Sequence, residues 1–390
     1  MAFNPTPNQS LAIERQGNIL VSAAAGSGKT AVLVERVIKL LTDDSRNINA
    51  DELLIVTFTN AAAAEMRSRI EKRIDEECRK NHSSSTLLRQ KHLLSSAKIC
   101  TIDSFCIDLV RENFDKLGIA PDFKIGENAV LNQINESVVY SILNRYIESE
   151  NAVFSKLVDI VGGEYDEKKL AELLLSVYEY SRQLPTPQKW YDSIVSAYNF
   201  GKFSSENLWY NYAFSKADSL ICEMRDITAN IIDGISNVES LADHYLPSLY
   251  QLCDDLDELL HSAQTNDWNL FYSSLNAFYL PKLPTAKKGM GEYREFKALK
   301  EAFKQFKEKT LPTLSRLFYA NFDFIQGQFE DLYPPIKLFV DILKELDDAI
   351  FNEYNAQNIF TFHNIEHLAL KLLCSEKDGK IVVSKDAKNF

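Results

Sequence analysis

The first 125 residues alternate between short apolar runs and longer segments with helical periodicity. The apolar runs at 18–22, 53–57 and 98–102 have the length of buried strands. In the segment after each run, apolar residues recur every three or four positions, as they do on one face of a helix. Because parallel strands need crossover connections between them, this alternation predicts a parallel sheet with helices on both faces.

From about residue 128 to residue 373 the pattern is helical throughout, and few strands can be assigned. The stretch 208–263 is too long for one helix, and we expect Gly234 and Pro247 to divide it, because both residue types disfavour helix interiors. The sequence therefore predicts an α/β domain followed by an all-α region. The expected bounds are 1–125 for the first domain, 126–372 for the helical domain and 373–390 for a connection returning towards the first.

Composition narrows the class of protein. At 390 residues, 45% hydrophobic and 25% charged, the chain can bury a core and is not disordered. It contains no run of eighteen apolar residues and no N-terminal secretory pattern, so we expect neither a membrane span nor secretion. Its six cysteines lack C-x-x-C spacing, which favours reduced, mostly buried thiols in a cytoplasmic protein over disulfides or zinc ligands.

The net charge of −12 is unevenly distributed. Residues 1–126 carry 17 Lys+Arg and 16 Asp+Glu, whereas residues 127–390 carry 26 and 39. This acidity argues against a helical domain that is basic throughout, although local patches decide whether nucleic acid binds. The loop at Lys287 and Lys288 either contacts duplex phosphates or is only solvated, and the helical domain as a whole either docks a partner or contacts DNA.

The segment 22–30, SAAAGSGKT, lies between the first apolar run and a helical pattern. It matches the nucleotide-binding loop G-x-x-x-x-G-K-S/T, except that Ala23 replaces the first glycine. Backbone amides of such a loop surround phosphates, its lysine reaches the β- and γ-phosphates, and its threonine ligates Mg²⁺. The alternative is a strand-to-helix turn of small residues with an exposed lysine. The nucleotide-binding residues predicted in the loop are Ala23, Ala24, Ala25, Gly26, Ser27, Gly28, Lys29 and Thr30.

Two further polar segments follow the second and third predicted strands. Ligands bind at the carboxyl ends of parallel strands, where hydroxyls and helix amides hold phosphates and an aromatic ring stacks on a base. This arrangement favours single-stranded nucleic acid. We expect Asn60 to cap the next helix; the alternatives are that Phe58 packs in the core and that Asp103 or Ser104 serves only as a helix cap. The candidate residues are Thr57, Phe58, Thr59 and Asn60 after one strand, and Thr101, Asp103 and Ser104 after the other.

In this order, the segments resemble the first half of a superfamily 1 helicase of the UvrD/Rep type. The resemblance assigns Gln9 to adenine recognition, 22–30 to the Walker A loop, and both 57–66 (TFTNAAAAEM) and 101–106 to single-stranded DNA. Asp103 is a departure, since many relatives have histidine at that position. The resemblance implies ATP and Mg²⁺ as cofactors. It also implies that Lys29 and Thr30 of the loop are catalytic residues.

The resemblance is closest to helicase–nuclease A subunits of the AddAB or RexAB type, and segments 23–36, 53–66 and 177–182 carry it. It implies a partial RecA-like motor domain (1A) with a large inserted helical domain (1B). It also implies ATP-driven 3′→5′ movement on single-stranded DNA, unwinding of double-stranded DNA, and recombinational repair of double-strand breaks. An exonuclease domain beyond residue 390 and a second subunit of the AddB/RexB type are further implications.

A helicase needs one carboxylate for Mg²⁺ and another that positions the attacking water. No apolar strand ending in Asp-Glu is recognisable after residue 373. We therefore expect an N-terminal fragment of a helicase that binds ATP but lacks ATPase and nuclease activity by itself. Two alternatives remain open: a stand-alone UvrD-like helicase without a nuclease, and a non-helicase P-loop ATPase or kinase module.

The pattern His363-x-x-Glu366-His367 has two interpretations. It fits the H-x-x-E-H pattern of a class of zinc peptidases, in which both histidines lie on one helix face. In the helicase family a similar stretch ends the inserted helical domain. The sequence offers no identifiable third metal ligand downstream, which favours the second interpretation.

Overall fold

The computed structural model describes residues 4–43, 46, 48–80, 85–162, 167–199, 206–377, 380–385 and 387. The chain divides into two compact units, residues 1–135 with 349–390 (unit 1) and residues 136–348 (unit 2). Residues 349–372, which fall in the expected helical domain, group with unit 1 by their contacts. Of the expected connection 373–390, residues 378, 379, 386 and 388–390 lie outside the described part.

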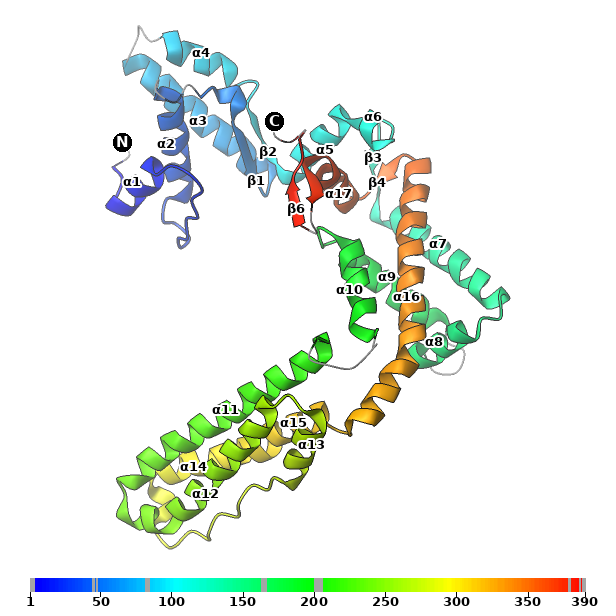
Figure 1. The fold of residues 1–390 in the computed structure, drawn as a ribbon. Coiled ribbons are helices and arrows are strands. Elements are labelled where there is room, and N and C mark those ends of the chain that lie inside the picture. Colours follow the sequence, from blue (N-terminus) through cyan, green and yellow to red (C-terminus); the bar gives the residue numbers. More distant parts are fainter. Residues whose placement is uncertain are drawn as a thin grey trace. The chain divides into compact units, whose positions relative to one another are not determined.

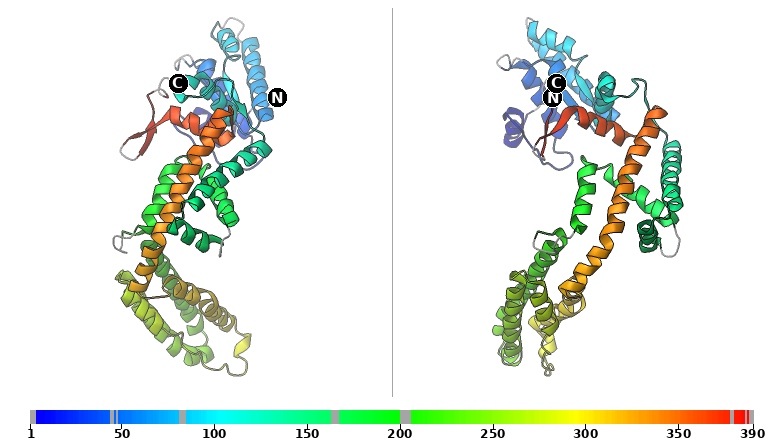
Figure 2. Two further views of the ribbon diagram at one scale, coloured as in Figure 1. Left: turned by 90° about the vertical axis from the view of Figure 1, so that its right-hand side faces the viewer. Right: turned by 45° about the vertical axis from the view of Figure 1, so that its right-hand side comes forward.

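Helices predominate in both units (Figure 1, Figure 2). No helix in the described ranges is both long enough and apolar enough to cross a bilayer.

Two of the expected strands form and pair in unit 1. β1 (Leu54–Thr57) and β2 (Lys98–Thr101) are parallel, and Thr57 lies opposite Thr101 at their carboxyl ends. The nonpolar faces of the neighbouring helices pack on this pair and bury an apolar core. The helices of this region are α1 (Pro7–Glu14), α2 (Lys29–Thr42), α3 (Asn60–Lys80) and α4 (Ser85–Leu93), with a 3₁₀ turn, η1 (Ala50–Glu52), before β1.

The strand expected at 18–22 does not form. Leu20 is 97% exposed, Val21 is half exposed, and among the described residues no strand pairs with this segment. An apolar run has the composition of a buried strand, but a strand also needs a neighbour that satisfies its backbone N–H and C=O groups. Without that neighbour the segment is an irregular lead into the loop that follows.

Unit 1 also brings together segments that are distant in the sequence. Strands β3 (Lys124–Ile125) and β4 (Ile359–Phe360) pair in parallel, and the buried Tyr354 hydroxyl donates to Asn135 Oδ1 at 2.6 Å. This pairing could not be predicted from the sequence, because two-residue strands carry no periodic signal. The remaining elements of unit 1 are α5 (Ile102–Glu112), α6 (Phe114–Leu117), α17 (Phe362–Leu373) and the antiparallel hairpin of β5 (Cys374–Lys377) and β6 (Lys380–Val383).

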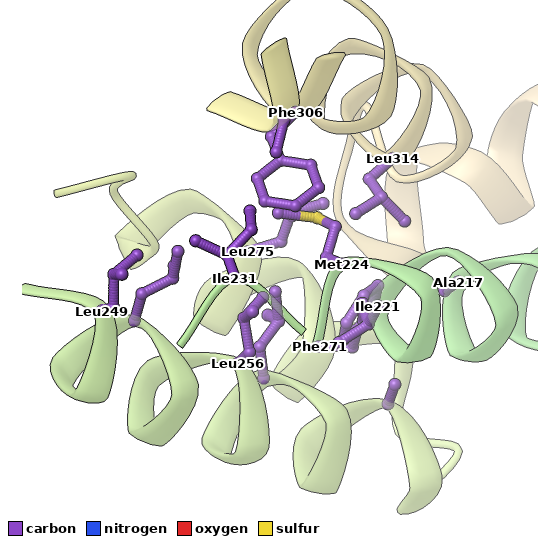
Figure 3. Packing of buried hydrophobic residues seen from close by; sticks show 14 of the residues in the cluster. Ala217, Ile221, Met224, Ile231, Leu249, Leu256, Phe271, Leu275, Phe306 and Leu314 are labelled. Carbon is purple, nitrogen blue, oxygen red and sulfur yellow. The ribbon is translucent and has the colours of Figure 1, made fainter. Parts of the chain in front are cut away.

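Unit 2 contains a long helical hairpin. α11 (Leu208–Ser236) and α12 (Glu239–Gln264) pack along each other. Met224, Phe306 and Leu314 lie close together in the core that the hairpin shares with shorter helices (Figure 3). The shorter elements of unit 2 are α8 (Ala152–Gly162), α9 (Glu167–Ser181), α10 (Pro187–Tyr198), α13 (Trp268–Ala277), η2 (Met290–Glu292), α14 (Arg294–Gln305), the π-helical η3 (Phe306–Thr310) and α15 (Leu311–Leu317). Two helices contribute residues to both units, α7 (Asn128–Glu148) and α16 (Phe322–Ala356).

Gly234 and Pro247 do not divide the hairpin, contrary to expectation. Gly234 lies inside α11 and Pro247 lies inside α12, and the chain reverses between the two helices. A proline removes one helical hydrogen bond. However, Tyr245 and Leu249, two residues before and after it, are buried in the core, and burial of a helix face outweighs such a local cost.

A buried ion pair connects three helices of unit 2. Arg182 Nη1, just after α9, lies 2.9 Å from Asp347 Oδ1 of α16, and the two side chains are 12% and 10% exposed. Gln188 Nε2 of α10 donates to Asp347 Oδ2 at 3.3 Å. Burial raises the pKa of Asp347, and the nearby Arg182 charge opposes that shift. The ionised form of this buried carboxylate therefore depends on the guanidinium.

We expect Arg182→Met to destabilise unit 2 by about 3–5 kcal/mol at pH 7, because the variant leaves a buried charge unpaired. Without the guanidinium, the folded-state pKa of Asp347 lies above its unfolded value. The cost is therefore absent below the unfolded pKa and grows as pH rises through the folded pKa, so the loss is smaller at pH 5. Urea unfolding followed by tryptophan fluorescence measures this loss, since Trp190, Trp209 and Trp268 all lie in unit 2.

The matched control is Lys344→Met, which removes an exposed ion pair with Asp192. It should cost about 0–1 kcal/mol at either pH. Equal losses in the two variants, or a loss in Arg182→Met that does not depend on pH, would contradict the role of the buried pair.

Candidate nucleotide and nucleic-acid site

The loop before α2 has the backbone that a phosphate-binding loop requires. Gly26 and Gly28 have φ angles of 77° and 84°, in the left-handed region where a side chain is disfavoured. Gly28 is the N-cap of α2, and no side-chain hydrogen bond caps this helix. The first N–H groups of α2 are therefore left for an anion, and the helix dipole favours negative charge at the same place.

Lys29 and Thr30 are both exposed in the first turn of α2. Lys29 Nζ donates to the backbone oxygens of Ala23 and Ala24, each at 2.8 Å. The ammonium group therefore lies against the loop itself, where phosphate oxygens can replace neutral carbonyls as its acceptors. The hydroxyl of Thr30 is accessible for a hydrated divalent cation, so these residues fit a nucleotide with Mg²⁺.

Gln9 lies next to this loop. Its Oε1 accepts a hydrogen bond from the Thr6 amide at 2.9 Å, which closes a capping box at the start of α1. Its Nε2 donates to the backbone oxygen of Ser27 at 3.0 Å. A Cβ atom on Gly28 would lie 3.2 Å from Gln9 Nε2, so the glycine also permits this close approach. The structure thus brings the proposed adenine-binding glutamine and the loop together.

The segment after β1 presents an aromatic ring to solvent. Phe58 is 95% exposed, so it is not a core residue. Thr59 Oγ1 accepts a hydrogen bond from the Ala62 amide at 3.2 Å. Thr59 therefore caps α3, and Asn60 is the first helical residue rather than the expected cap. The Thr57 hydroxyl donates to the Thr59 backbone oxygen at 3.0 Å and shapes the turn between strand and helix.

The segment after β2 is more closed. Thr101 is the N-cap of α5, and its Oγ1 accepts a hydrogen bond from the Ser104 amide at 3.1 Å. The two hydroxyls lie 2.8 Å apart, and Thr101 is only 7% exposed. Thr101 is thus the cap, rather than Asp103 or Ser104, both of which are half-buried in the first turn of α5. Because β1 and β2 are parallel and in register, the two candidate DNA segments lie at the same edge of the sheet.

A forked ion pair joins α2, which follows the loop, to α3, which begins two residues after Phe58. Arg73 Nε and Nη2 of α3 lie 2.6 and 3.0 Å from the two carboxylate oxygens of Glu35 on α2. A further contact runs from Arg73 Nη1 to Glu77 at 2.8 Å. The hydrogen bond with Glu35 raises the pKa of Arg73. This pair could not be predicted from the sequence, because two charges 38 positions apart give no local signal.

The described side chains do not support the interpretation of His363-x-x-Glu366-His367 as a zinc-peptidase pattern. His363 Nδ1 lies 3.0 Å from Glu366 Oε2 within α17. No group of three His, Cys, Asp or Glu residues in the described ranges could hold a metal ion.

The six cysteines are free, as expected, but Cys106 is the only buried one; the other five are intermediate in exposure. The expectation that most of them are buried was wrong. Burial raises the pKa of Cys106 to about 11, so its thiol is protonated at neutral pH.

Comparison with known proteins agrees with the geometry of unit 1. Residues 4–384 match the family model of the UvrD/REP helicase N-terminal domain. Relatives that the chain resembles include the ATP-dependent helicase/nuclease subunits A of Ruminiclostridium cellulolyticum, Acetivibrio thermocellus and Clostridium beijerinckii. The identities are 31%, 30% and 32%, over 97%, 96% and 99% of this chain.

The same alignments cover 30%, 30% and 31% of those relatives, so the chain spans about 30% of their length. The family model, in contrast, covers nearly the whole chain and includes the loop, Gln9 and both segments at the sheet edge. The chain therefore belongs to the UvrD/REP helicase family, through the N-terminal domain of that family.

Proposed function

We propose that this chain forms the ATP-binding and single-stranded-DNA-binding part of an ATP-dependent helicase/nuclease A subunit. In this proposal residues 1–125, which lie in unit 1, form the first part of a RecA-like motor domain (1A), and residues 126–372 form the inserted helical domain (1B). The observation that carries the proposal is the combination, in one unit, of an open α2 N-terminus and a fully exposed aromatic ring at the sheet edge. A P-loop ATPase or kinase module unrelated to DNA has no need of that ring.

The loop residues divide the work of holding ATP. The backbone amides from Ala23 to Gly28 and the first turn of α2 surround the phosphates. Lys29 exchanges its two carbonyl acceptors for β- and γ-phosphate oxygens, and Thr30 contributes a hydroxyl to the Mg²⁺ shell. Mg²⁺ supplies charge neutralisation at the phosphates when bound. Gln9, held against Ser27, recognises the adenine.

Single-stranded DNA lies along the edge where β1 and β2 end. Phe58 stacks on a base, which is a contact that tolerates any sequence. Hydroxyls and helix amides around Thr59, Asn60 and Ser104 hold the backbone phosphates. Thr57 and Thr101 shape the two turns, because the Thr57 hydroxyl donates to the Thr59 backbone oxygen and Thr101 Oγ1 accepts from the Ser104 amide. Asp103 also lies at this edge, but its carboxylate repels phosphates, so a direct phosphate contact is least favourable at this residue.

The name of the relatives, which includes both helicase and nuclease, supports a proposal for the activity of the whole protein. We infer 3′→5′ translocation, unwinding and strand cleavage in recombinational repair, with a second subunit of the AddB/RexB type, in the cytoplasm. Residues 1–390 alone bind ATP without motor-like turnover, because hydrolysis needs a carboxylate pair that the sequence does not present on an apolar strand.

The proposal that the chain binds double-stranded DNA is best supported by a basic surface of unit 2. Residues 281–317 contain ten Lys+Arg and four Asp+Glu, in a helical region that is otherwise strongly acidic. On α14 and η3 (yellow in Figure 1), four exposed lysines recur at helical spacing, while Phe296 and Leu299 face the core. In the described ranges no ion pair involves any of the four. We call Lys297, Lys300, Lys304 and Lys307 the α14 basic face.

A row of lysines without ion pairs to other described residues suits a duplex because phosphates are contacted by point charges without regard to base sequence. The loop at Lys287 and Lys288 was expected either to contact a duplex or to be only solvated. The same two alternatives apply to the larger basic surface that includes the α14 basic face. An acidic partner protein is the other occupant that such a face accepts.

Lys29→Ala should weaken binding of Mg-ATP to residues 1–390 about 10- to 100-fold, since it removes a charge-assisted contact with phosphate. Isothermal titration calorimetry measures the affinity. The control is Lys72→Ala, an exposed lysine of α3, which should bind as the unaltered chain does. If Lys29→Ala binds Mg-ATP as tightly as the unaltered chain, the nucleotide assignment fails.

Phe58→Ala should weaken binding of a short single-stranded oligonucleotide by about 1–3 kcal/mol, the range for one base–aromatic stack. Mg-ATP binding should stay unchanged, because the ring is not part of the loop. Fluorescence anisotropy with a labelled thymidine oligomer gives the affinity. The matched control is Phe114→Ala in α6, another exposed phenylalanine. Equal affinity of Phe58→Ala and the control would argue against a stacking role.

Replacement of the α14 basic face by glutamine should weaken binding of duplex DNA and reduce its salt dependence. The slope of log K against log salt falls by about 0.9 for each phosphate that a lysine no longer neutralises. Binding of the thymidine oligomer should not change. The control carries Lys156→Gln and Lys168→Gln, two exposed lysines of unit 2 that are paired with Asp331 and Glu172. An unchanged duplex affinity and slope would leave an acidic protein as the occupant of this face.

A further inference from the structure

The helix that carries Gln9 has an unusual attachment to unit 1. α1 is eight residues long and buries none of them. A helix this short is not stable by itself in water, and most protein helices are held by an apolar face. Since no residue of α1 is fully buried, the position of α1, and therefore of Gln9, depends largely on polar contacts.

The strongest of these contacts come from one side chain of α2. Arg36 Nη1 donates to the backbone oxygens of Ala12, Ile13 and Arg15, at 2.9, 3.3 and 2.8 Å. These carbonyls lie at the C-terminal end of α1, where helix carbonyls lack partners within the helix and the dipole favours a cation. The last turn of α1 has no basic residue of its own, so Arg36 provides the positive charge.

The other contacts are weaker or depend on Gln9 itself. Lys39 Nζ lies 3.2 Å from Glu14 Oε1, but both side chains are exposed, and exposed pairs contribute little. Gln9 Nε2 donates to the Ser27 backbone oxygen. α1 is thus held at one end by Arg36 and at the other by Gln9 on the loop.

We propose that Arg36 is a positioning residue for adenine recognition: it holds the C-terminal end of α1 on α2 and so keeps Gln9 at the phosphate loop. The inference rests on the proposed function, in which Gln9 recognises the base. Arg36 is seven residues beyond Lys29 and hydrogen-bonds to α1 rather than to the loop. Its loss should therefore affect the base and leave the triphosphate contacts intact.

Three ligands separate these contributions in residues 1–390: Mg-ATP, Mg-GTP and magnesium tripolyphosphate, each titrated by calorimetry. The unaltered chain should prefer ATP to GTP. Arg36→Gln should reduce that preference about 10-fold, equal to about 1.4 kcal/mol, with tripolyphosphate affinity within about twofold. Arg36→Lys keeps the charge at the end of α1 and should recover part of the preference. Lys39→Gln, which removes only the exposed pair, is the control and should have no effect.

A double variant tests whether Arg36 acts through Gln9. Gln9→Ala should lose the same preference, and Gln9→Ala with Arg36→Gln should lose no more than either alone, because both changes remove one interaction. Additive losses would overturn the proposal. A parallel loss of tripolyphosphate affinity would also overturn it, since Arg36 would then support the whole loop.

The failure of the proposed function has a different signature. If Lys29→Ala binds tripolyphosphate as the unaltered chain does, the loop is not a phosphate site and both proposals fall together. If Lys29→Ala loses tripolyphosphate while Arg36→Gln retains the full preference for ATP over GTP, only the role of Arg36 is overturned.

Discussion

The arrangement of unit 1 depends on the backbone conformation and the packing at the start of α2. The chain enters this helix through Gly28 at a φ of 84°, a conformation that disfavours any side chain. The same helix then packs its apolar face, including Val37 and Leu41, against α3 and the strands. One element therefore supplies both the open N-terminus and part of the core. The loop is held in place by apolar packing behind it, because the segment before it has no strand partner among the described residues.

Local pattern predicted the elements whose signal lies within a few residues. The loop, β1, β2 and the helices that follow them were all found, because each has its own period or turn chemistry. The strand at 18–22 was wrong because composition cannot show whether a neighbouring strand is present. The assignment of helix caps also failed, since Thr59 and Asn60 are adjacent and both residue types make good caps. The expected exposure of Phe58 is confirmed, although the sequence left core packing as an alternative, because an isolated phenylalanine at a strand end fits either core or surface.

The net charge of the helical region conceals a local basic surface of unit 2. A net charge summed over residues 127–390 is strongly negative, yet lysines at helical spacing collect on one side of α14. The sum treats Arg182, which is paired and buried with Asp347, as equal to Lys297, which is exposed. Partners respond to exposed charges, so the local distribution decides what this unit attracts.

Within unit 1, α1 and α2 are held in place by different kinds of interaction. Val34 and Leu41 of α2 are 4% and 3% exposed, so displacement of α2 exposes apolar surface at about 25 cal/mol per Å². Displacement of α1 breaks hydrogen bonds to Arg36, for which water can substitute at small net cost. In the proposed function, the helix with Gln9 can therefore adjust to a bound base while the helix with Lys29 keeps its place. Since the two helices are close in the sequence and differ in what holds them, the proposed base recognition and phosphate binding can change independently of each other.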